Sequence, residues 1–212
     1  MRTRICLLLL AIQTLAPAVI IDRIAVVIGN SIIKDSDIER DIRVTSFLNN
    51  RPVDLSAASR KKAVERLIGQ VFIRREIRIG DYPTATLEEA DQQLDKLKKQ
   101  RFKTNAAFEE AVRRYGLTDL ELRTQFQWQL TVLKFIDVRF RPAVFITDTD
   151  IDKYYRQHRA ELERAYPGES LDDLRDRIRE ILTGENINRE FFSWLDDQRK
   201  NNKIEFREGS LA

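Results

Sequence analysis

The longest predicted helix of the chain lies in residues 118–142, TDLELRTQFQWQLTVLKFIDVRFRP. Thr118 followed three residues later by Glu121 is the pattern of a capping box, which satisfies backbone N–H groups where a helix begins. The helix can extend to about Arg139, because Pro142 cannot continue it. At 100° per residue the apolar side chains form two faces, Leu122, Phe126, Leu133, Ile136 and Phe140 on one and Trp128, Val132, Phe135 and Val138 on the other. A helix that is apolar on two faces either lies centrally in a bundle or keeps one face for a partner.

Further helices are expected on both sides of this segment. Capping patterns, apolar stripes and terminating residues predict helices over residues 36–48, 57–79, 86–102 and 106–115. A strand-like stretch at 144–146, a helix from Thr147, a helix from Ser170 to Gly184 and a last one from about Asn186 to Lys200 should follow. A charged content of 33% with only 7 glycines and 5 prolines is typical of helical proteins. The sequence therefore predicts a mainly α fold with a bundle-like body.

Two short β-elements flank the helices. IDRIAVVIGNSII, residues 21–33, predicts a β-hairpin with a tight turn at Gly29–Asn30. The first helix should begin just after it, with a capping box of Ser36 and Glu39. KIEFR, residues 203–207, alternates apolar and charged side chains, as a half-buried strand does.

Residues 1–18, MRTRICLLLLAIQTLAPA, have the layout of a secretory signal peptide. Arg2 and Arg4 precede an apolar run, and small residues ending at Ala18 follow it. The run is shorter than the roughly 20 residues of a spanning helix. We expect cleavage after Ala18, with an uncleaved anchor as the alternative. The mature protein is then periplasmic or otherwise exported, without an integral membrane segment and without cysteine, since the one cysteine lies in the signal.

The charge of the mature chain is close to balanced. Cleavage of the signal removes Arg2 and Arg4 from the 37 basic residues. The remaining 35 basic residues and the 34 acidic residues give a net charge of +1. Nucleic-acid binders carry a clear basic footprint, and this chain has none. Nucleic acid is therefore not expected as a partner.

The sequence offers no motif for catalysis. It contains no G-x-S-x-G, no H-E-x-x-H, no glycine-rich phosphate loop and no C-x-x-C. His158 is the single histidine and has no partners at metal-ligand spacing, so we expect an exposed residue without a catalytic or metal-binding role. We expect no cofactor and no metal, and a function in binding.

Three stretches are similar to one protein family. IDRIAVVIGNSIIKDSDIERDI, residues 21–42, resembles the amino-terminal hairpin and first helix of SurA-type periplasmic chaperones. ITDTDIDKYY, residues 146–155, resembles the segment that leads into a parvulin prolyl isomerase domain in those proteins. INREFFSWLDDQRKNNKIEFRE, residues 187–208, resembles their carboxy-terminal helix and strand.

The resemblance implies a core module without the inserted isomerase domain. A signal peptide (1–18) precedes an N-terminal helical chaperone module (19–142), a linker region where an isomerase domain would be inserted (143–169), and C-terminal helices with a strand that complete the module (170–212). Residues 156–169 are far fewer than the roughly 50 residues of an independent domain. Isomerase activity is therefore not expected.

The implied function is that of a periplasmic, ATP-independent holdase for unfolded or extended polypeptides such as outer-membrane protein precursors. The candidate client-binding residues are large apolar side chains on the second face of the longest helix and aromatic residues near it in sequence: Phe102, Phe108, Tyr115, Trp128, Val132, Phe135 and Val138. Trp128 and Phe135 also fit an interpretation as ordinary core residues. The alternative function is a non-catalytic adaptor or assembly protein that docks to one fixed envelope partner. The oligomeric state is left open.

The layout of the family also predicts the tertiary pairing. The strand at 203–207 should pair with the hairpin strand at 24–28 and bring the two ends of the mature chain together. Trp194 should then be buried against the amino-terminal helices.

Overall fold

The computed structural model describes residues 22–207, so the expected signal peptide lies outside the described part of the chain. Seven α-helices, one short 3-10 helix and three strands make up that part. In chain order they are β1 (Ile24–Ile28), β2 (Ser31–Lys34), α1 (Asp35–Leu48), α2 (Ala57–Gly80), α3 (Leu87–Arg101), α4 (Asn105–Arg114), α5 (Asp119–Phe140), η1 (Arg141–Ala143), α6 (Asp148–Ala165), α7 (Leu171–Lys200) and β3 (Ile204–Phe206). The predicted mainly α fold with a small β-element is confirmed.

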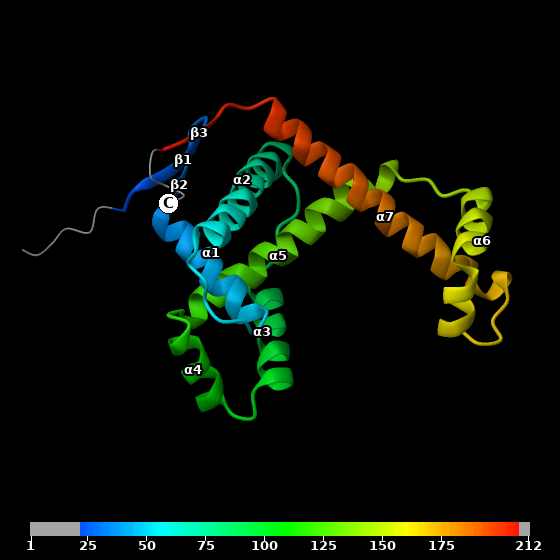
Figure 1. Cartoon of the computed structure of the whole chain (residues 1–212), viewed down its shortest axis with the longest axis horizontal. Helices are drawn as coiled ribbons and strands as arrows, with labels where there is room; N and C mark the ends of the chain where they lie inside the picture. Colours follow the sequence, from blue (N-terminus) through cyan, green and yellow to red (C-terminus); the bar gives the residue numbers. More distant parts are fainter. Residues whose placement is uncertain (1–21, 208–212) are drawn as a thin grey trace, which may run out of the picture.

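The small sheet joins the two ends of the described chain. Its strand order is β2-β1-β3 with antiparallel pairing throughout, and Val27 faces Ile32 on one side and Glu205 on the other. The turn between β1 and β2 needs a positive φ of 55° at Gly29, a conformation that glycine adopts without strain. Figure 1 shows β3 beside β1, next to the end of α7. The predicted pairing of the last strand with the hairpin is therefore confirmed.

Four helices begin at the cap residues that the sequence predicts, and each of these caps is a capping box, which depends on only four consecutive residues. The boxes join Thr86 to Glu89, Thr118 to Glu121, Thr147 to Asp150 and Ser170 to Asp173.

The predicted capping box at the start of α1 is wrong. The Lys34 backbone N–H donates to the Asp37 carboxylate at 3.0 Å, so the N-cap is Lys34, two residues earlier than the expected Ser36. The Ser36 hydroxyl instead donates to Asp22 at 2.6 Å, which ties the segment before β1 to α1. The register of the preceding strand decides between two overlapping patterns, and the local sequence does not show that register.

Helix α5 is the central element of the body, but the prediction that it is the longest helix is wrong, because α7 has 30 residues and α5 has 22. Its first half contributes Leu122 and Phe126 to a cluster with α1, α3 and α4, and its second half contributes Phe135 and Phe140 to a cluster with α2 and α7. Both apolar faces are thus used by core packing at different positions along the helix. This arrangement explains why one helix carries two apolar faces.

Trp194 of α7 connects this core to the layer beneath the sheet. It packs against both the cluster formed by the sheet, α1 and α2 and the cluster formed by α2, α5 and α7. Its ring centroid lies 5.6 Å from that of Phe135. The tryptophan is half-buried, so the predicted contact with the amino-terminal helices is confirmed and its complete burial is wrong.

Helix α6 and the first half of α7 form an arm with a small core of its own. Ile151 and Leu162 of α6 pack against Leu174 and Ile178 of α7, and all four are buried. Figure 1 shows α6 beside the end of α7 that lies farthest from the sheet. Most of the expected linker region, residues 143–169, is therefore an ordered helix, because its apolar residues have a partner in α7.

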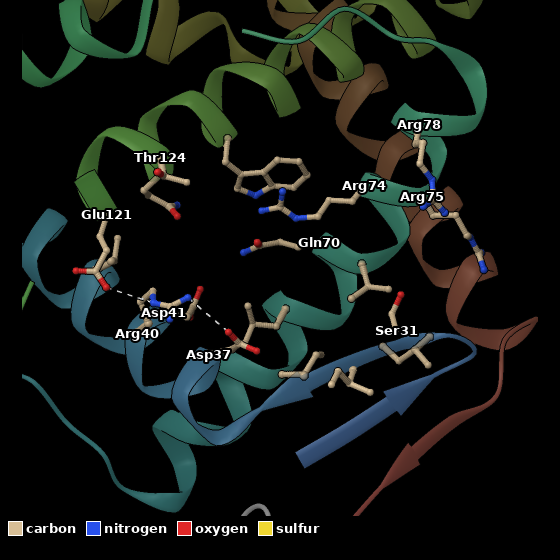
Figure 2. Close-up of a pocket in the computed structure, with 18 of the residues that line it drawn as sticks. Ser31, Asp37, Arg40, Asp41, Gln70, Arg74, Arg75, Arg78, Glu121 and Thr124 are labelled. Carbon is tan, nitrogen blue, oxygen red and sulfur yellow. Dashed lines mark hydrogen bonds and ion pairs between the residues drawn. The ribbon is translucent and has the colours of Figure 1, made fainter. Parts of the chain in front are cut away.

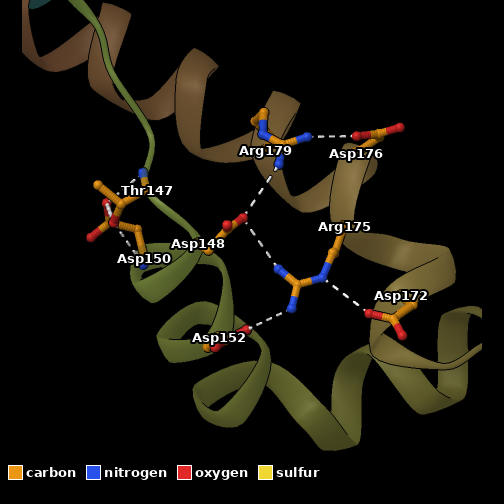
Figure 3. A network of polar contacts seen from close by, with 8 residues as sticks. All are labelled: Thr147, Asp148, Asp150, Asp152, Asp172, Arg175, Asp176 and Arg179. Atoms are coloured by element: carbon orange, nitrogen blue, oxygen red, sulfur yellow. Dashed lines mark hydrogen bonds and ion pairs between the residues drawn. The ribbon is translucent and has the colours of Figure 1, made fainter.

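A charged network on the surface of the arm also joins the two helices (Figure 3). The Arg175 guanidinium lies 3.3 Å from Asp148 and 3.4 Å from Asp152 of α6, and 3.1 Å from Asp172 of its own helix. Arg179 lies 3.6 Å from the same Asp148. Exposed pairs of this kind contribute little one by one, but here two arginines hold α6 against α7 in one register.

Two other predictions about this region are wrong. Gly184 does not end a helix, because α7 runs through it without a break and is held by apolar residues on both sides, Leu182 in the arm and Ile187 in the body. The expected strand at 144–146 does not form, because no strand lies beside it in the described residues. Val144 and Ile146 pack instead into the cores of the body and of the arm.

Candidate functional site

A trough with a volume of about 1100 Å³ opens between the turn end of the hairpin, α1, α2 and the first half of α5 (Figure 2). Elements far apart in the sequence meet here because the sheet packs on α1 and α2, and α5 packs against both helices. The trough takes its walls from residues 28–33, 37–44, 67–78 and 120–128.

Aliphatic side chains line the bottom of the trough and part of its rim. Ile28 and Ile33 of the sheet are buried, while Leu67 and Val71 of α2 are half-buried. Leu120 at the start of α5 is 67% exposed. Leu67, Val71 and Leu120 therefore expose apolar surface to water, and a ligand could cover that surface.

The wall formed by α1 and α5 carries the acidic groups of the trough. Arg40 lies between them, 3.3 Å from Glu121 and 3.5 Å from Asp37 (Figure 2). Asp41 receives hydrogen bonds from Arg66, with 3.0 Å between Nε and Oδ2. Burial raises the pKa of the Asp41 carboxyl above its ordinary value, and Arg66 opposes that rise. Each carboxylate on this wall therefore has an arginine partner.

The wall formed by α2 carries three arginines in little more than one helical turn. The Arg74 guanidinium lies 3.8 Å from the centroid of the Trp128 ring. Arg75 donates to the amide oxygens of Gln198 and Asn202 at 2.7 and 2.9 Å. Arg78 makes no ion pair or hydrogen bond through its side chain within residues 22–207. None of these three arginines pairs with a carboxylate in the described part of the chain.

Three polar side chains on the α2 and α5 walls have no hydrogen-bond partner among the described residues. The amides of Gln70 and Gln125 and the hydroxyl of Thr124 line the trough and make no hydrogen bond to any described residue. Amides both donate and accept, so they match the needs of a polypeptide backbone.

The seven candidate residues from the sequence do not form one surface. Phe102, Phe108 and Tyr115 surround Phe47 in the core between α1, α3 and α4, with ring centroids 5.4 to 6.3 Å from that of Phe47. Phe108 is 2% exposed, so its prediction as a surface residue is wrong. These aromatic residues hold α4 against the body and lie outside the trough.

The remaining four candidates lie on α5 in different environments. Phe135 is fully buried against Tyr82 and Trp194, so the core interpretation is correct for it and the surface interpretation is wrong. Val132 is half-buried in the same cluster, and Val138 is 48% exposed away from the trough. Trp128 is the one candidate that lines the trough.

Sequence reasoning missed the α2 wall, although a signal for it exists. Gln70, Arg74 and Arg78 recur every four residues and share one helix face that carries no acidic residue. Because no carboxylate of α2 lies on this face, the spacing indicates positive charge that is not neutralised by its own helix.

His158 has a structural role in the arm. It is half-buried rather than exposed, its ring stacks on Tyr154 with 4.0 Å between centroids, and its Nδ1 lies 3.0 Å from the Tyr154 carbonyl oxygen. The backbone of α6 departs from helical geometry at this residue. Residues 22–207 contain no cluster of histidine, cysteine and carboxylate side chains that could hold a metal ion.

No protein-family model matches the chain, and no curated protein matches its sequence. Among the helices of residues 22–207, none has both the length and the apolar character needed to span a membrane.

Proposed function

We propose that this protein is a periplasmic, ATP-independent holdase that binds unfolded or extended polypeptides, such as outer-membrane protein precursors, in the trough. The observation that carries this proposal is the trough itself, an open channel with an aliphatic floor, unused amides and charged walls. The proposed location rests on the signal-like residues 1–18.

An extended chain fits the chemistry of the trough. Its apolar side chains would cover Leu67, Val71 and Leu120, which gains free energy roughly in proportion to the area removed from water. Gln70 and Gln125 could hydrogen-bond to its backbone without regard to sequence. Charged walls keep such an apolar surface soluble when no client is bound. Binding of this kind needs no nucleotide, because each contact is weak and reversible.

The free edge of the sheet adds a second way to hold an extended chain. Strand β2 lies at the edge, and its residues Ser31, Ile32 and Ile33 line the trough. An edge strand offers backbone groups to another extended segment. Strand addition would position a client along the apolar floor.

The proposal includes the absence of prolyl isomerase activity. The segment where the resemblance places an isomerase domain, residues 143–169, folds as α6 and packs on α7. This agrees with a core module that works by binding alone.

Aggregation suppression tests the proposal. The protein should slow the aggregation of several unrelated unfolded proteins, and Leu120→Glu should weaken client binding about tenfold, since covering one leucine is worth somewhat more than 1.4 kcal/mol. Leu133→Glu is the matched control, because Leu133 is a similarly exposed leucine of α5, at 62%, outside the trough. If the wild-type protein leaves all clients to aggregate, or if both variants lose activity equally, the holdase proposal is wrong.

One observation favours the alternative of an adaptor with a single fixed partner. Phe145 and Phe192 are 82% and 60% exposed, and neither lines the trough. Large exposed aromatics are typical of surfaces that bind a folded protein. Pull-down of one folded envelope protein, abolished by Phe145→Ser and unaffected by Leu120→Glu, would favour the adaptor over the holdase.

A further inference from the structure

The two walls of the trough differ in how their charges are compensated. On α1 and α5, Asp37 and Glu121 contact Arg40, and Asp41 contacts Arg66. On α2, the three arginines have no carboxylate partner within residues 22–207. The α2 wall therefore presents uncompensated positive charge to whatever occupies the trough.

Arg74 and Arg75 of this wall are held in place without being neutralised. Arg74 stacks on the Trp128 ring, a contact that orients the guanidinium plane and leaves its N–H edges available. Partial burial lowers the pKa of Arg74, but a guanidinium stays protonated at any physiological pH. Arg75 donates only to neutral amides, and the one carboxylate between these residues, Glu76, pairs with Arg139 of α5 at 2.7 Å.

We propose that the α2 wall binds acidic side chains of an extended polypeptide, carried at alternate positions and flanked by apolar residues. Arg74 and Arg78 are separated by four residues, or about 6 Å of helix rise. Side chains on one face of an extended chain recur every two residues, or about 6.6 Å. The positions of Arg74 and Arg78 along α2 are therefore spaced like two acidic residues in an Asp/Glu-x-Asp/Glu pattern of an extended chain. This inference rests on the proposed function and specifies the class of client.

The shape and composition of the trough favour a polypeptide over other anions. The arginines stand beside an aliphatic floor of Leu67 and Val71, which a free phosphate ion would leave uncovered. A flat anionic bilayer could reach the rim but not the floor of a concave site. A single carboxy-terminal carboxylate would occupy only one of the two arginines.

Fluorescence anisotropy with matched peptides tests the inference. One labelled peptide carries apolar residues and two glutamates at alternate positions, the other has glutamine in their place, and both have amidated ends. The wild-type protein should bind the glutamate peptide about tenfold more tightly at low salt, an advantage that shrinks as salt is added. The double variant Arg74→Gln/Arg78→Gln should lose the advantage and still bind the glutamine peptide. Neither residue belongs to a core cluster, so the fold should survive, as a thermal melt can check.

The double variant Arg156→Gln/Arg164→Gln is the control for net charge. Both residues are exposed on α6, outside the trough, and neither forms an ion pair in the described part of the chain. It should keep the full preference for glutamate.

Equal affinity of the wild-type protein for the two peptides would overturn the inference and leave the holdase proposal standing, whereas failure to bind either peptide would overturn the holdase proposal. Loss of the preference in both double variants would show a non-specific charge effect and overturn the inference. Phosphatidylglycerol vesicles or inorganic phosphate could also displace the glutamate peptide at concentrations that leave the glutamine peptide bound. That result would overturn the inference in favour of a general anion site.

Discussion

Replacing Phe135 by alanine should lower the free energy of unfolding by about 3 to 5 kcal/mol, the usual cost of removing a buried phenylalanine ring. The ring is 0% exposed and lies at the centre of the cluster shared by α2, α5 and α7. Its centroid is 5.0 Å from that of Tyr82, 5.9 Å from Phe140 and 5.6 Å from Trp194, so alanine leaves three aromatic partners facing a cavity.

Thermal and urea denaturation followed by circular dichroism would measure the effect. For a chain of this size, 1 kcal/mol corresponds to roughly 2 to 4 °C, so the melting temperature should fall by about 6 to 20 °C. Val138→Ala on the same helix is the control and should change the free energy of unfolding by less than about 0.5 kcal/mol, because Val138 is 48% exposed. If the two variants melted alike, the packing of α5 described above would be refuted.

Three further predictions concern the ends of the chain, the arm and the response to acid. Truncation after Lys200 removes β3, the partner of β1, and should lower the melting temperature by several degrees; an unchanged melt would contradict the three-stranded sheet. Gly184→Ala should stabilise α7 by up to about 1 kcal/mol, because alanine is the better helix former and a Cβ there meets no atom within 4 Å; destabilisation in urea would contradict a helix that is continuous through this residue. Hydrogen bonds from Lys134 to Glu89, from Thr147 to Asp150 and from Ser170 to Asp173 lower the pKa of each carboxyl below its ordinary 4.5 or 3.8. Because the folded pKa is the lower one, these groups stabilise the fold above those ordinary values, and the stabilisation should be lost as the pH falls through the folded pKa values, which urea titrations from pH 6 to pH 2 would measure.

The parts of the fold that the sequence predicts depend on short segments. The capping box of Thr118 and Glu121 involves four consecutive residues, and the Gly29 turn involves two. The pairing of β3 with β1 is a long-range contact, and the alternating pattern of residues 203–207 predicts only that a strand exists there. The resemblance to a chaperone core supplied its partner.

The parts that could not be predicted depend on neighbours far away in the sequence. A glycine often follows the last turn of a helix, but apolar contacts on both sides of Gly184 keep α7 continuous. From their sequence context, Phe108 and Phe135 could be surface or core residues. They are buried because Phe108 packs against Phe47 and Phe102, and Phe135 packs against Tyr82 and Trp194. Local patterns do not carry that information.

The trough was not foreseen because four separate segments build it. The apolar stripe within residues 57–79 predicts that α2 packs on another element. The neighbouring face of Gln70, Arg74 and Arg78 becomes part of a site only because Trp128 and the hairpin lie beside it. Of the candidate residues from the sequence, Trp128 alone reaches this site. Charge compensation, rather than the number of aromatic residues, is the feature that distinguishes the site.

Site-specific photo-crosslinking tests the central claim most directly. A benzophenone side chain placed at residue 120, inside the trough, should crosslink to an unfolded client, and the same group at residue 133, outside it, should not. Folded versions of the same client should crosslink at neither position. Crosslinks of equal yield at the two positions, or none at residue 120 while the client is held in solution, would contradict the claim that extended polypeptides bind in the trough.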